Sequence, residues 1–423
     1  MKFATLLLLL ICFNLNAQAN WQPIPEIASN TNNQRFDDVF FLNDNLGWAA
    51  NGYYAAVYKT TDGGITWTEQ LNEDILGGSF YFRNIEFLNE NVGFLGTLNG
   101  IFFKTTDGGN NWTPVIITPN PPAICGLDAI GNSTIYGCGA YFTPAHIIKS
   151  TDSGDTWQHI DMSTYADALV EVLFLDELTG YASGQNNNGG VILKTTDGGA
   201  TWTELLNTNI PGEYVWKLQT LEGNPNIMFG SVSSINPHNG KLIKSIDAGV
   251  TWSSLDAPET NVQAVGFITE NHGWMGGHST GFYETLDGGI SWTNLNIGSN
   301  LNRILIINSG LAYACGTTIY KFTDENLGIT NFQETNKENL TITLHSNPVE
   351  NDLEFTIHFN SDDNILITLY DINGKYIKQL TRDIITTKTT KSYSFPVDML
   401  ASGIYILDFH NNTGRSSLKF TKK

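Results

Sequence analysis

Between residues 20 and 325 the chain repeats one pattern of apolar and polar positions roughly every 45 residues. Each copy holds four short stretches rich in apolar and aromatic residues, separated by glycine and polar residues. In the first copy they lie near Asp38–Leu42, Gly47–Ala50, Ala55–Thr60 and Thr66–Glu69. Such short runs with such breaks are typical of β-strands. Four antiparallel strands in a unit of this length predict one blade of a β-propeller.

A nine-residue motif, here called a box, lies between the third and fourth predicted strands of six copies. The first box reads Lys-Thr-Thr-Asp-Gly-Gly-Ile-Thr-Trp over residues 59–67. An Asp can accept hydrogen bonds from the backbone of its own turn, a Gly can take positive φ, and a Trp can bury its ring beside a strand. We therefore interpret the Asp and Trp residues as structural, with weak calcium binding and catalysis as the alternatives for the Asp. The structural residues are Asp62, Trp67, Asp107, Trp112, Asp152, Trp157, Asp197, Trp202, Asp247, Trp252, Asp287 and Trp292.

A seventh copy is incomplete, because three predicted strands between residues 303 and 322 are followed by no box. The segment Asn20-Trp-Gln-Pro23 resembles the fourth strand of the second copy, Asn111-Trp-Thr-Pro114. We expect this N-terminal strand to complete the last blade. Closure of the ring in this way would leave no open sheet edge. The sequence therefore predicts an all-β fold with a seven-bladed propeller over residues 20–325.

The first 19 residues have the features of a signal peptide. Lys2 is followed by an apolar stretch that is too short to span a bilayer, and Ala17-Gln-Ala19 offers small residues for cleavage. We expect the mature chain to begin at Asn20. The alternatives are a retained membrane anchor and a lipoprotein at Cys12. The lipoprotein is rejected because Ile11 stands where a small residue is needed.

After residue 325 the pattern changes. Residues 326–339 are polar and indicate a linker, and residues 340–423 alternate as strands of a small β-sandwich. A hairpin is expected around Asn373-Gly374, a dipeptide that favours a tight turn. The sequence thus predicts a second domain over residues 340–423.

Charge and composition exclude several classes of protein. The formal net charge is −20, and residues 20–339 hold 33 acidic against 12 basic residues. Such an acidic chain is a poor partner for nucleic acid, whose phosphates need a basic face. Three cysteines remain after the predicted cleavage, Cys125, Cys138 and Cys315. Small buried residues are the favoured interpretation, and a disulfide between Cys125 and Cys138 stays open.

The motifs resemble two known families. The boxes resemble the Asp-box, or bacterial neuraminidase repeat, and their combination with the preceding Phe-x-x-acidic-x-x-Gly-Trp phrase resembles photosystem II stability/assembly-factor propellers. The Asn-Pro at 347–348, the Asp-x-x-Gly-Lys segment at 371–375, the Leu-x-x-Gly-x-Tyr segment at 400–405 and the Lys-rich end resemble a type IX secretion system sorting domain. That resemblance implies contact with the type IX secretion machinery, export across the outer membrane, and removal of the domain or attachment to surface lipopolysaccharide.

Candidate ligand-binding residues lie on the loops between the second and third strands and at the starts of first strands. Aromatic rings there suit a sugar face or a protein hot spot, and cations at the centre of the ring would be isolated in an acidic domain. The alternatives are rings that pack within their own loops and cations that are simply solvated. These candidates are Tyr53, Tyr54, Arg83, Tyr141, Phe142, Trp216, Lys217 and Arg303.

We interpret the chain as a non-catalytic binding or scaffold propeller at the cell surface that recognises a protein or glycan. No cofactor or metal is expected, because the histidines show no ligand spacing. The alternative is an extracellular glycoside hydrolase. A sialidase would need an arginine triad, and the propeller holds only Arg35, Arg83 and Arg303, whereas a xyloglucanase-like enzyme would need only two carboxylates. A third hypothesis is a structural component of a surface layer.

Overall fold

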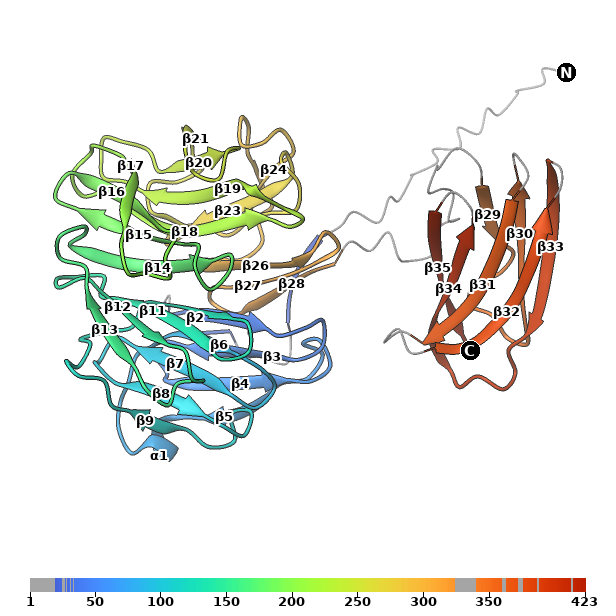
Figure 1. Ribbon diagram of the computed structural model, residues 1–423, viewed down its shortest axis with the longest axis horizontal. Helices are drawn as coiled ribbons and strands as arrows, with labels where there is room; N and C mark the ends of the chain where they lie inside the picture. The colour runs from blue at the N-terminus through green and yellow to red at the C-terminus, as the bar shows by residue number, and fades with distance from the viewer. Residues whose placement is uncertain are drawn as a thin grey trace, which may run out of the picture. The chain divides into compact units, whose positions relative to one another are not determined.

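The structure is a computed structural model with two compact units, residues 18–325 and residues 326–423, each with its own core (Figure 1). It describes residues 20–323 apart from 25, 26, 28, 31 and 33, and residues 340–423 apart from 360–362, 372–375, 386–387 and 412–413. The predicted signal peptide, the linker at 326–339 and the Asn373-Gly374 turn lie outside the described residues.

Residues 20–323 form seven four-stranded antiparallel sheets within the described part of the chain. Each sheet is one blade of a propeller, and its strands follow one another in sequence order in six of the seven. Blades 1 to 3 are β2 (Phe36–Phe41), β3 (Gly47–Asn51), β4 (Ala56–Thr60), β5 (Thr68–Leu71); β6 (Phe82–Phe87), β7 (Gly93–Thr97), β8 (Phe102–Thr105), β9 (Thr113–Val115); and β10 (Gly126–Ile130), β11 (Thr134–Gly139), β12 (His146–Ser150), β13 (Gln158–Asp161). One short helix, α1 (Glu73–Leu76), follows β5.

Blades 4 to 6 have the same order, blade 7 takes its outer strand from the N-terminus, and the first hairpin of blade 5 is longer than the others. They are β14 (Ala168–Phe174), β15 (Gly180–Asn186), β16 (Gly189–Thr195), β17 (Thr203–Asn207); β18 (Tyr214–Leu221), β19 (Asn224–Ser233), β20 (Lys241–Ser245), β21 (Ser253–Asp256); β22 (Val262–Phe267), β23 (Gly273–Gly277), β24 (Tyr283–Thr285), β25 (Thr293–Asn294); and β26 (Arg303–Asn308), β27 (Leu311–Cys315), β28 (Ile319–Thr323) with β1 (Asn20–Pro23). The predicted all-β propeller is confirmed.

The N-terminal strand closes the ring as the sequence predicts. Strand β1 pairs antiparallel with β28, with Trp21 opposite Phe322. The Trp21 ring is fully buried, stacks on Phe282 at 4.3 Å between ring centroids and meets the edge of Trp274 at 5.5 Å. The first strand of the chain is therefore held to the last blade by backbone pairing and by an aromatic cluster.

Each box folds as a turn centred on its Asp carboxylate. In the first box, Thr60 donates to Asp62 at 2.8 Å, and the Thr66 backbone and hydroxyl donate to the same carboxylate at 2.9 and 2.6 Å. Gly63 and Gly64 have φ values of 70° and 85°, which glycine adopts without strain. Because Thr66 is held in the turn, the fourth strand starts at Thr68, two residues later than predicted.

The box tryptophans are less buried than the sequence suggests. Only Trp202 is buried, and the other five are partly exposed. The indole N–H of Trp67 donates to Gly64 of its own box at 3.2 Å, and its ring meets the edge of Phe41. Trp48 in β3 and Trp274 in β23 are instead fully buried, because second strands lie in the interior of the blades.

Boxes also tie neighbouring blades together. The Lys59 ammonium and the Trp48 indole of blade 1 both donate to the Gly108 carbonyl in the box of blade 2, at 3.0 and 3.2 Å. The Gly63 backbone N–H donates to Asn45, which places the box beside the turn between strands one and two. These turns and the boxes therefore share one face of the propeller, which we call the box face.

The C-terminal unit is a β-sandwich of two sheets. One sheet has the order β29 (Leu340–Leu344), β30 (Asp352–Phe359), β33 (Thr389–Pro396), and the other has β32 (Tyr376–Ile385), β31 (Asp363–Asp371), β34 (Gly403–Asn411), β35 (Gly414–Lys422). Strand β30 alternates buried and exposed side chains, as expected when one face covers a core. Its buried residues Leu353, Phe355, Ile357 and Phe359 belong to that core, so the predicted sandwich is confirmed.

Candidate functional site

The aromatic loops gather on the face opposite the boxes, which we call the loop face. The turn between the first and second strands of each blade lies on the box face. Because these strands are antiparallel, the first strand starts and the second strand ends at the loop face. Tyr53, Tyr54, Tyr141 and Phe142 are 55, 41, 44 and 40% exposed. The two rings of each pair meet edge to face, at centroid distances of 5.2 and 4.8 Å. Each pair thus packs within its own loop and still presents aromatic surface to solvent.

Trp216 reaches from blade 5 to residues of blades 2 and 3. The Arg83 guanidinium of β6 lies 5.8 Å from the centroid of the Trp216 ring, within the range of a cation–π contact. Tyr214 stacks on Trp216 at 5.2 Å and donates its hydroxyl to the Tyr141 carbonyl at 2.8 Å. Both rings pack against a buried cluster that includes Cys125. The structure therefore places Arg83 against Trp216, and Tyr214 links Trp216 to the loop that holds Tyr141 and Phe142.

The arginines are not isolated cations, and this expectation was wrong. Asp37 accepts from Arg83 at 2.8 Å and lies 3.3 Å from Nε of Arg35, with all three side chains buried or nearly so. Nη1 of Arg35 also donates to Gln263 at 2.8 Å and to Asn300 at 3.2 Å. Two arginines thus share one carboxylate, because burying either without a partner would be costly. This group carries a net positive charge inside an acidic domain.

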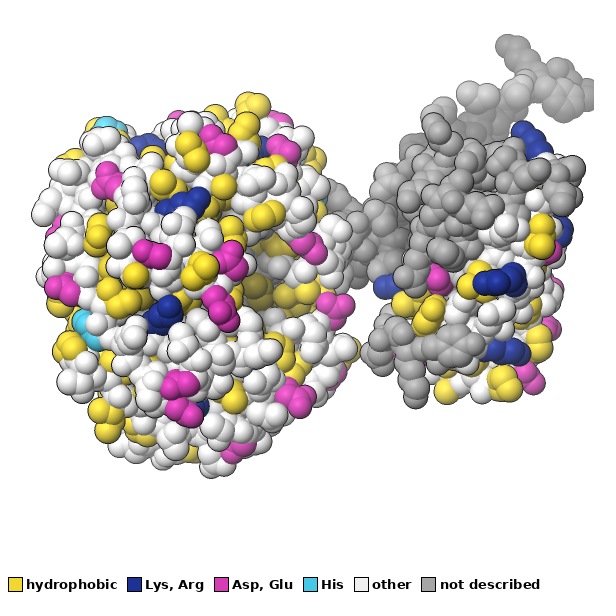
Figure 2. Space-filling view, viewed as in Figure 1, with side chains coloured by type: hydrophobic (Ala, Val, Ile, Leu, Met, Phe, Trp, Pro, Cys, Tyr) yellow, Lys and Arg dark blue, Asp and Glu magenta, His cyan; other side chains and the backbone are white. Residues whose placement is uncertain are grey.

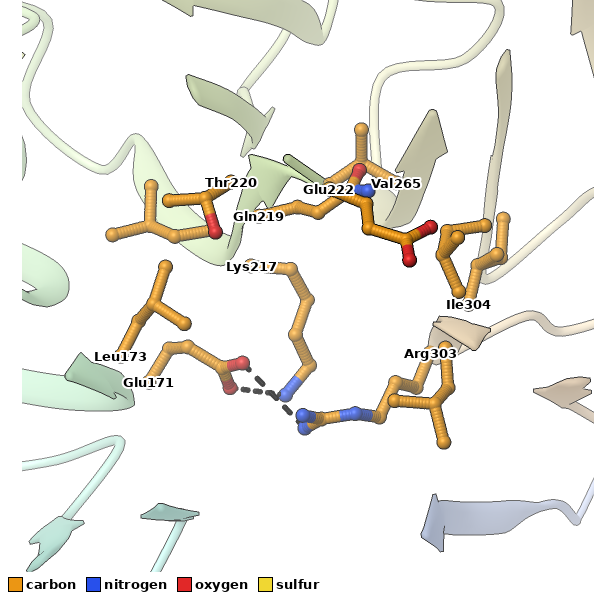
Figure 3. Close-up of a pocket in the computed structure, with 12 residues that line it drawn as sticks. Glu171, Leu173, Lys217, Gln219, Thr220, Glu222, Val265, Arg303 and Ile304 are labelled. Atoms are coloured by element: carbon orange, nitrogen blue, oxygen red, sulfur yellow. Dashed lines mark hydrogen bonds and ion pairs between the residues drawn. The ribbon is translucent and has the colours of Figure 1, made fainter. Parts of the chain in front are cut away.

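Lys217 and Arg303 meet deeper in the channel, on the carboxylate of Glu171 (Figure 3). Lys217 lies 2.5 Å and Arg303 3.5 Å from Glu171, and Arg303 also lies 3.4 Å from Asp38. Lys217, Arg303 and Glu171 come from the first strands of blades 5, 7 and 4, respectively. They line a pocket of about 170 Å³ whose other walls include Leu173, Gln219, Glu222, Val265 and Ile304–Ile306.

Further carboxylates on first strands bind the next blade. Asp38 accepts from the Ile85 backbone at 3.0 Å, and Asp128 accepts from the Phe174 backbone. Burial raises the pKa of Asp128 to about 7, and burial together with the charge of Asp128 raises the pKa of Glu86 well above its usual range. Gln219 makes the same kind of bridge to Phe267 through both of its amide atoms, at 2.7 and 2.8 Å.

The predicted residues therefore fall into three places. Arg83, Trp216, Tyr141 and Phe142 share the loop face at the channel, Lys217 and Arg303 lie in the pocket below, and Tyr53 and Tyr54 form a separate pair on the loop of blade 1. The acidic partners Asp37, Asp38 and Glu171 were missed. Their signal is present in the sequence, since each is a charged residue within an otherwise apolar first strand, as in Phe-Asp-Asp-Val-Phe-Phe at 36–41.

Other candidate chemistry can be placed as well. Cys125, Cys138 and Cys315 are buried free thiols, and burial raises the pKa of each. Within the described residues, no three His, Cys, Asp or Glu side chains are placed to hold a metal ion. Figure 2 shows many acidic and few basic side chains on the propeller face that it draws.

Two family models match separate parts of the chain. Residues 14–143 match the model described as Photosynthesis system II assembly factor YCF48. Residues 343–423 match the Secretion system C-terminal sorting domain. No curated protein matches the chain. The tail is thus a secretion sorting domain, and it indicates export across the outer membrane to the cell surface or extracellular space.

Solved propellers have a similar fold. YCF48 from Cyanidioschyzon merolae is 20% identical, with a TM-score of 0.57, over 73% of this chain and 100% of that one. A structure of YCF48 bound to D1 peptide is also 20% identical, with a TM-score of 0.55, over 72% and 96%. PorZ, a surface component of the type IX secretion system of Porphyromonas gingivalis, is 15% identical, with a TM-score of 0.53, over 93% of this chain and 60% of that one. At these identities the likeness concerns the fold. Among the residues that the structure describes, no helix is long and apolar enough to cross a membrane.

Proposed function

We propose that the protein is a non-catalytic binding or scaffold propeller outside the cell, which recognises a protein or glycan on its loop face. The observation that carries the proposal is the contact of Arg83 with Trp216, which Tyr214 links to the Tyr141–Phe142 loop of a third blade. The exposed Tyr141 and Phe142 rings offer flat apolar contact, and the buried Arg83, paired with Asp37, holds the Trp216 ring beside their loop. Aromatic residues and arginine are the side chains most enriched in binding hot spots.

Proteins of similar fold support a binding role for the propeller. YCF48 has been solved bound to D1 peptide, and PorZ is a surface component of a secretion system. The sorting tail supports a partner at the cell surface and contact with the type IX machinery during export. The experiment below therefore includes both proteins and glycans as candidate ligands.

The bonding of the channel carboxylates favours binding over hydrolysis. Asp37, Asp38 and Glu171 each bind a cation, and Asp128 accepts from a backbone N–H of the next blade. A glycosidase needs one carboxyl free to donate a proton and a second free to act as base or nucleophile. These four groups instead hold the first strands together. Hydrolysis by a carboxylate of the channel is therefore the outcome that would overturn the proposal.

The test uses the full chain on a panel of surface proteins, sialosides and polysaccharides, with binding and product release read in the same wells. The paired variant Tyr141→Ser/Phe142→Ser removes exposed rings at little expected cost to the fold, and Trp216→Ala removes the ring under Arg83. We expect both to weaken binding at least roughly tenfold. The matched control is Ile65→Ser, which removes a side chain that is 68% exposed on the box face.

Two results would contradict the proposed function. One is product release that disappears in Asp128→Asn while binding is kept, because that variant removes a proton donor without removing an exposed ring. The other is binding that falls in Ile65→Ser as much as in the Tyr141→Ser/Phe142→Ser variant, because the loop face would then have no special role.

A further inference from the structure

Comparison of the six boxes distinguishes the positions whose residue type the turn requires from those where it can vary. The residues just before the Asp and three after it are exposed in every box. In blades 2 and 3 they are polar, namely Thr106, Asn110, Thr151 and Asp155. The turn keeps the same hydrogen bonds whichever side chains stand there, as the carboxylates of Asp107 and Asp247 show. The identity of these residues is therefore free to serve another role.

In blades 5 and 6 both positions are aliphatic. Ile246 and Val250 flank Asp247 and are 67 and 68% exposed, and Leu286 and Ile290 flank Asp287 and are 69 and 76% exposed. Leu178 on the adjoining turn of blade 4 is 59% exposed, where blades 1, 2 and 6 have Asn45, Asn91 and Asn271. We call these five aliphatic residues the box-face arc.

The residues of the arc belong to blades 4, 5 and 6, which follow one another in the chain (Figure 1). The Tyr181 hydroxyl of blade 4 donates to Ala248, in the box of blade 5, at 3.0 Å. The Trp292 indole of blade 6 donates to the Asp256 carbonyl of blade 5 at 3.2 Å. Single exposed aliphatic residues are ordinary on a protein surface, whereas several of them on one face of three consecutive blades make that face a candidate interaction site.

The charges beside the arc indicate the chemistry of its partner. Asp176, Asp247 and Asp287 lie next to the aliphatic residues, and hydrogen bonds from the neighbouring Thr, Ser and backbone groups lower the pKa of each carboxyl. These carboxylates stay ionised at neutral pH. Two lysines lie at the blade 5 box: Lys244 is paired with Glu270 at 3.3 Å, and Lys194 donates to the Ala248 carbonyl at 3.5 Å. An anionic lipid surface would be repelled here, and so would a second copy of this acidic face.

We propose that the box-face arc is a second docking surface, which binds a polypeptide segment that presents aliphatic side chains flanked by Lys or Arg. Aliphatic contacts would provide the buried area, and the ionised box aspartates would select cationic flanks. This surface lies on the face opposite the aromatic loops. The inference is thus independent of the ligand proposed for the loop face, and with both faces occupied the propeller would bridge two partners.

The test uses a variant whose substitutions are copied from another blade of the same propeller. Ile246→Thr, Val250→Asn, Leu286→Thr and Ile290→Asn together install the residues that blade 2 holds at the same positions. Ile65→Asn in blade 1 is the matched control, because Ile65 is equally exposed and lies outside the arc. The full chain is titrated by fluorescence anisotropy with a short synthetic peptide of alternating Ile and Lys. Peptides with Glu in place of Lys, or Ser in place of Ile, are measured in parallel.

We expect the Ile/Lys peptide to bind the unaltered protein and Ile65→Asn alike, and the fourfold variant roughly tenfold more weakly. Neither altered peptide should bind the unaltered protein. Equal affinity for the fourfold variant, or equal binding of the Glu peptide, would overturn the proposal. A dimer in sedimentation velocity, or binding to lipopolysaccharide vesicles, would also overturn it if the fourfold variant abolished that association, because the arc would then have another occupant. Equal urea midpoints for the three proteins would establish that the substitutions leave the fold intact.

Discussion

At the scale of single residues, the box aspartate accepts hydrogen bonds from the side chains and backbone of its own turn. In blade 4, Asp197 accepts from the Thr195 hydroxyl, the Thr201 backbone and the Thr201 hydroxyl, at 2.8, 2.9 and 2.6 Å. These bonds, with the Thr201 hydroxyl first, lower the pKa of Asp197 to about 2. The ionised carboxylate is therefore the form that the folded turn prefers.

This preference predicts how Asp197→Ala behaves. The variant loses three acceptor contacts at one turn, so its Tm at pH 7 should fall by roughly 2–4 °C. Because the folded pKa is depressed below the ordinary 3.8, the stabilisation is present above that value and is lost as the pH falls toward 2. The difference in urea midpoint between variant and unaltered protein should narrow over that range. Asp155→Ala, which removes an exposed partner of Lys104, should change little, and an equal loss in both variants would contradict the assignment.

Asp128 shows the opposite electrostatic behaviour. Burial raises its pKa to about 7, with Glu171 adding to the effect and Arg303 opposing it. The folded state therefore binds the proton more tightly than the unfolded chain. Its contribution to stability is complete at low pH and is lost as the pH rises from about 4 through 7.

Asp128→Asn should abolish this loss of stability at higher pH. Its amide oxygen can still accept the hydrogen bond from the Phe174 backbone N–H. Relative to the unaltered protein, the variant should gain on the order of 3 kcal/mol of unfolding free energy between pH 4.5 and pH 8. Urea unfolding at the two pH values measures this gain. A stability difference that does not change with pH would show that Asp128 is ionised throughout.

At the scale of elements, the ring depends on a four-residue strand contributed by the other end of the propeller. Strand β1 forms the outer edge of the last blade and places Trp21 among Trp274, Phe282 and Phe322. The pairing joins residues about 300 positions apart in sequence. Its contribution is therefore realised only when the ring is nearly complete.

Trp21→Ala should open this closure. Truncation of a fully buried Trp costs about 3–5 kcal/mol, and the loss should appear as a lower urea midpoint of the propeller. Gln22→Ala is the matched control, because Gln22 keeps the same backbone pairing to Lys321 with an exposed side chain. A Trp21→Ala midpoint equal to that of Gln22→Ala would mean that the strand does not support the ring.

At the scale of the whole molecule, the chain consists of two compact units with separate hydrophobic cores. A core is the cooperative unit of unfolding, so we expect two transitions rather than one. Trp21→Ala should move one transition, and Phe355→Ala, in the buried centre of the sandwich, should move the other. Calorimetry of the full chain measures both. A single transition that both variants shift would show that the units unfold together.

The repeat, the blade and the closing strand could all be predicted from the order of residues along the chain. Four short strands and a box recur at similar spacing, and each box is built from contacts within a few residues, as with Thr60, Asp62 and Thr66. Local hydrogen bonding and alternating burial can be read from neighbouring residues, because both depend on short sequence separations. The same holds for the alternating strands of the sorting domain.

Which charged side chains pair, and which residues of different blades lie side by side, is decided only in the folded ring. Three contacts join residues from different blades: Arg83 with Asp37, Lys217 with Glu171, and Arg83 over the Trp216 ring. The repeat predicts where each first strand lies, but not which side chains turn toward one another across the channel. Partners there depend on the long-range closure of the ring, and they form because a buried charge without a partner would be too costly.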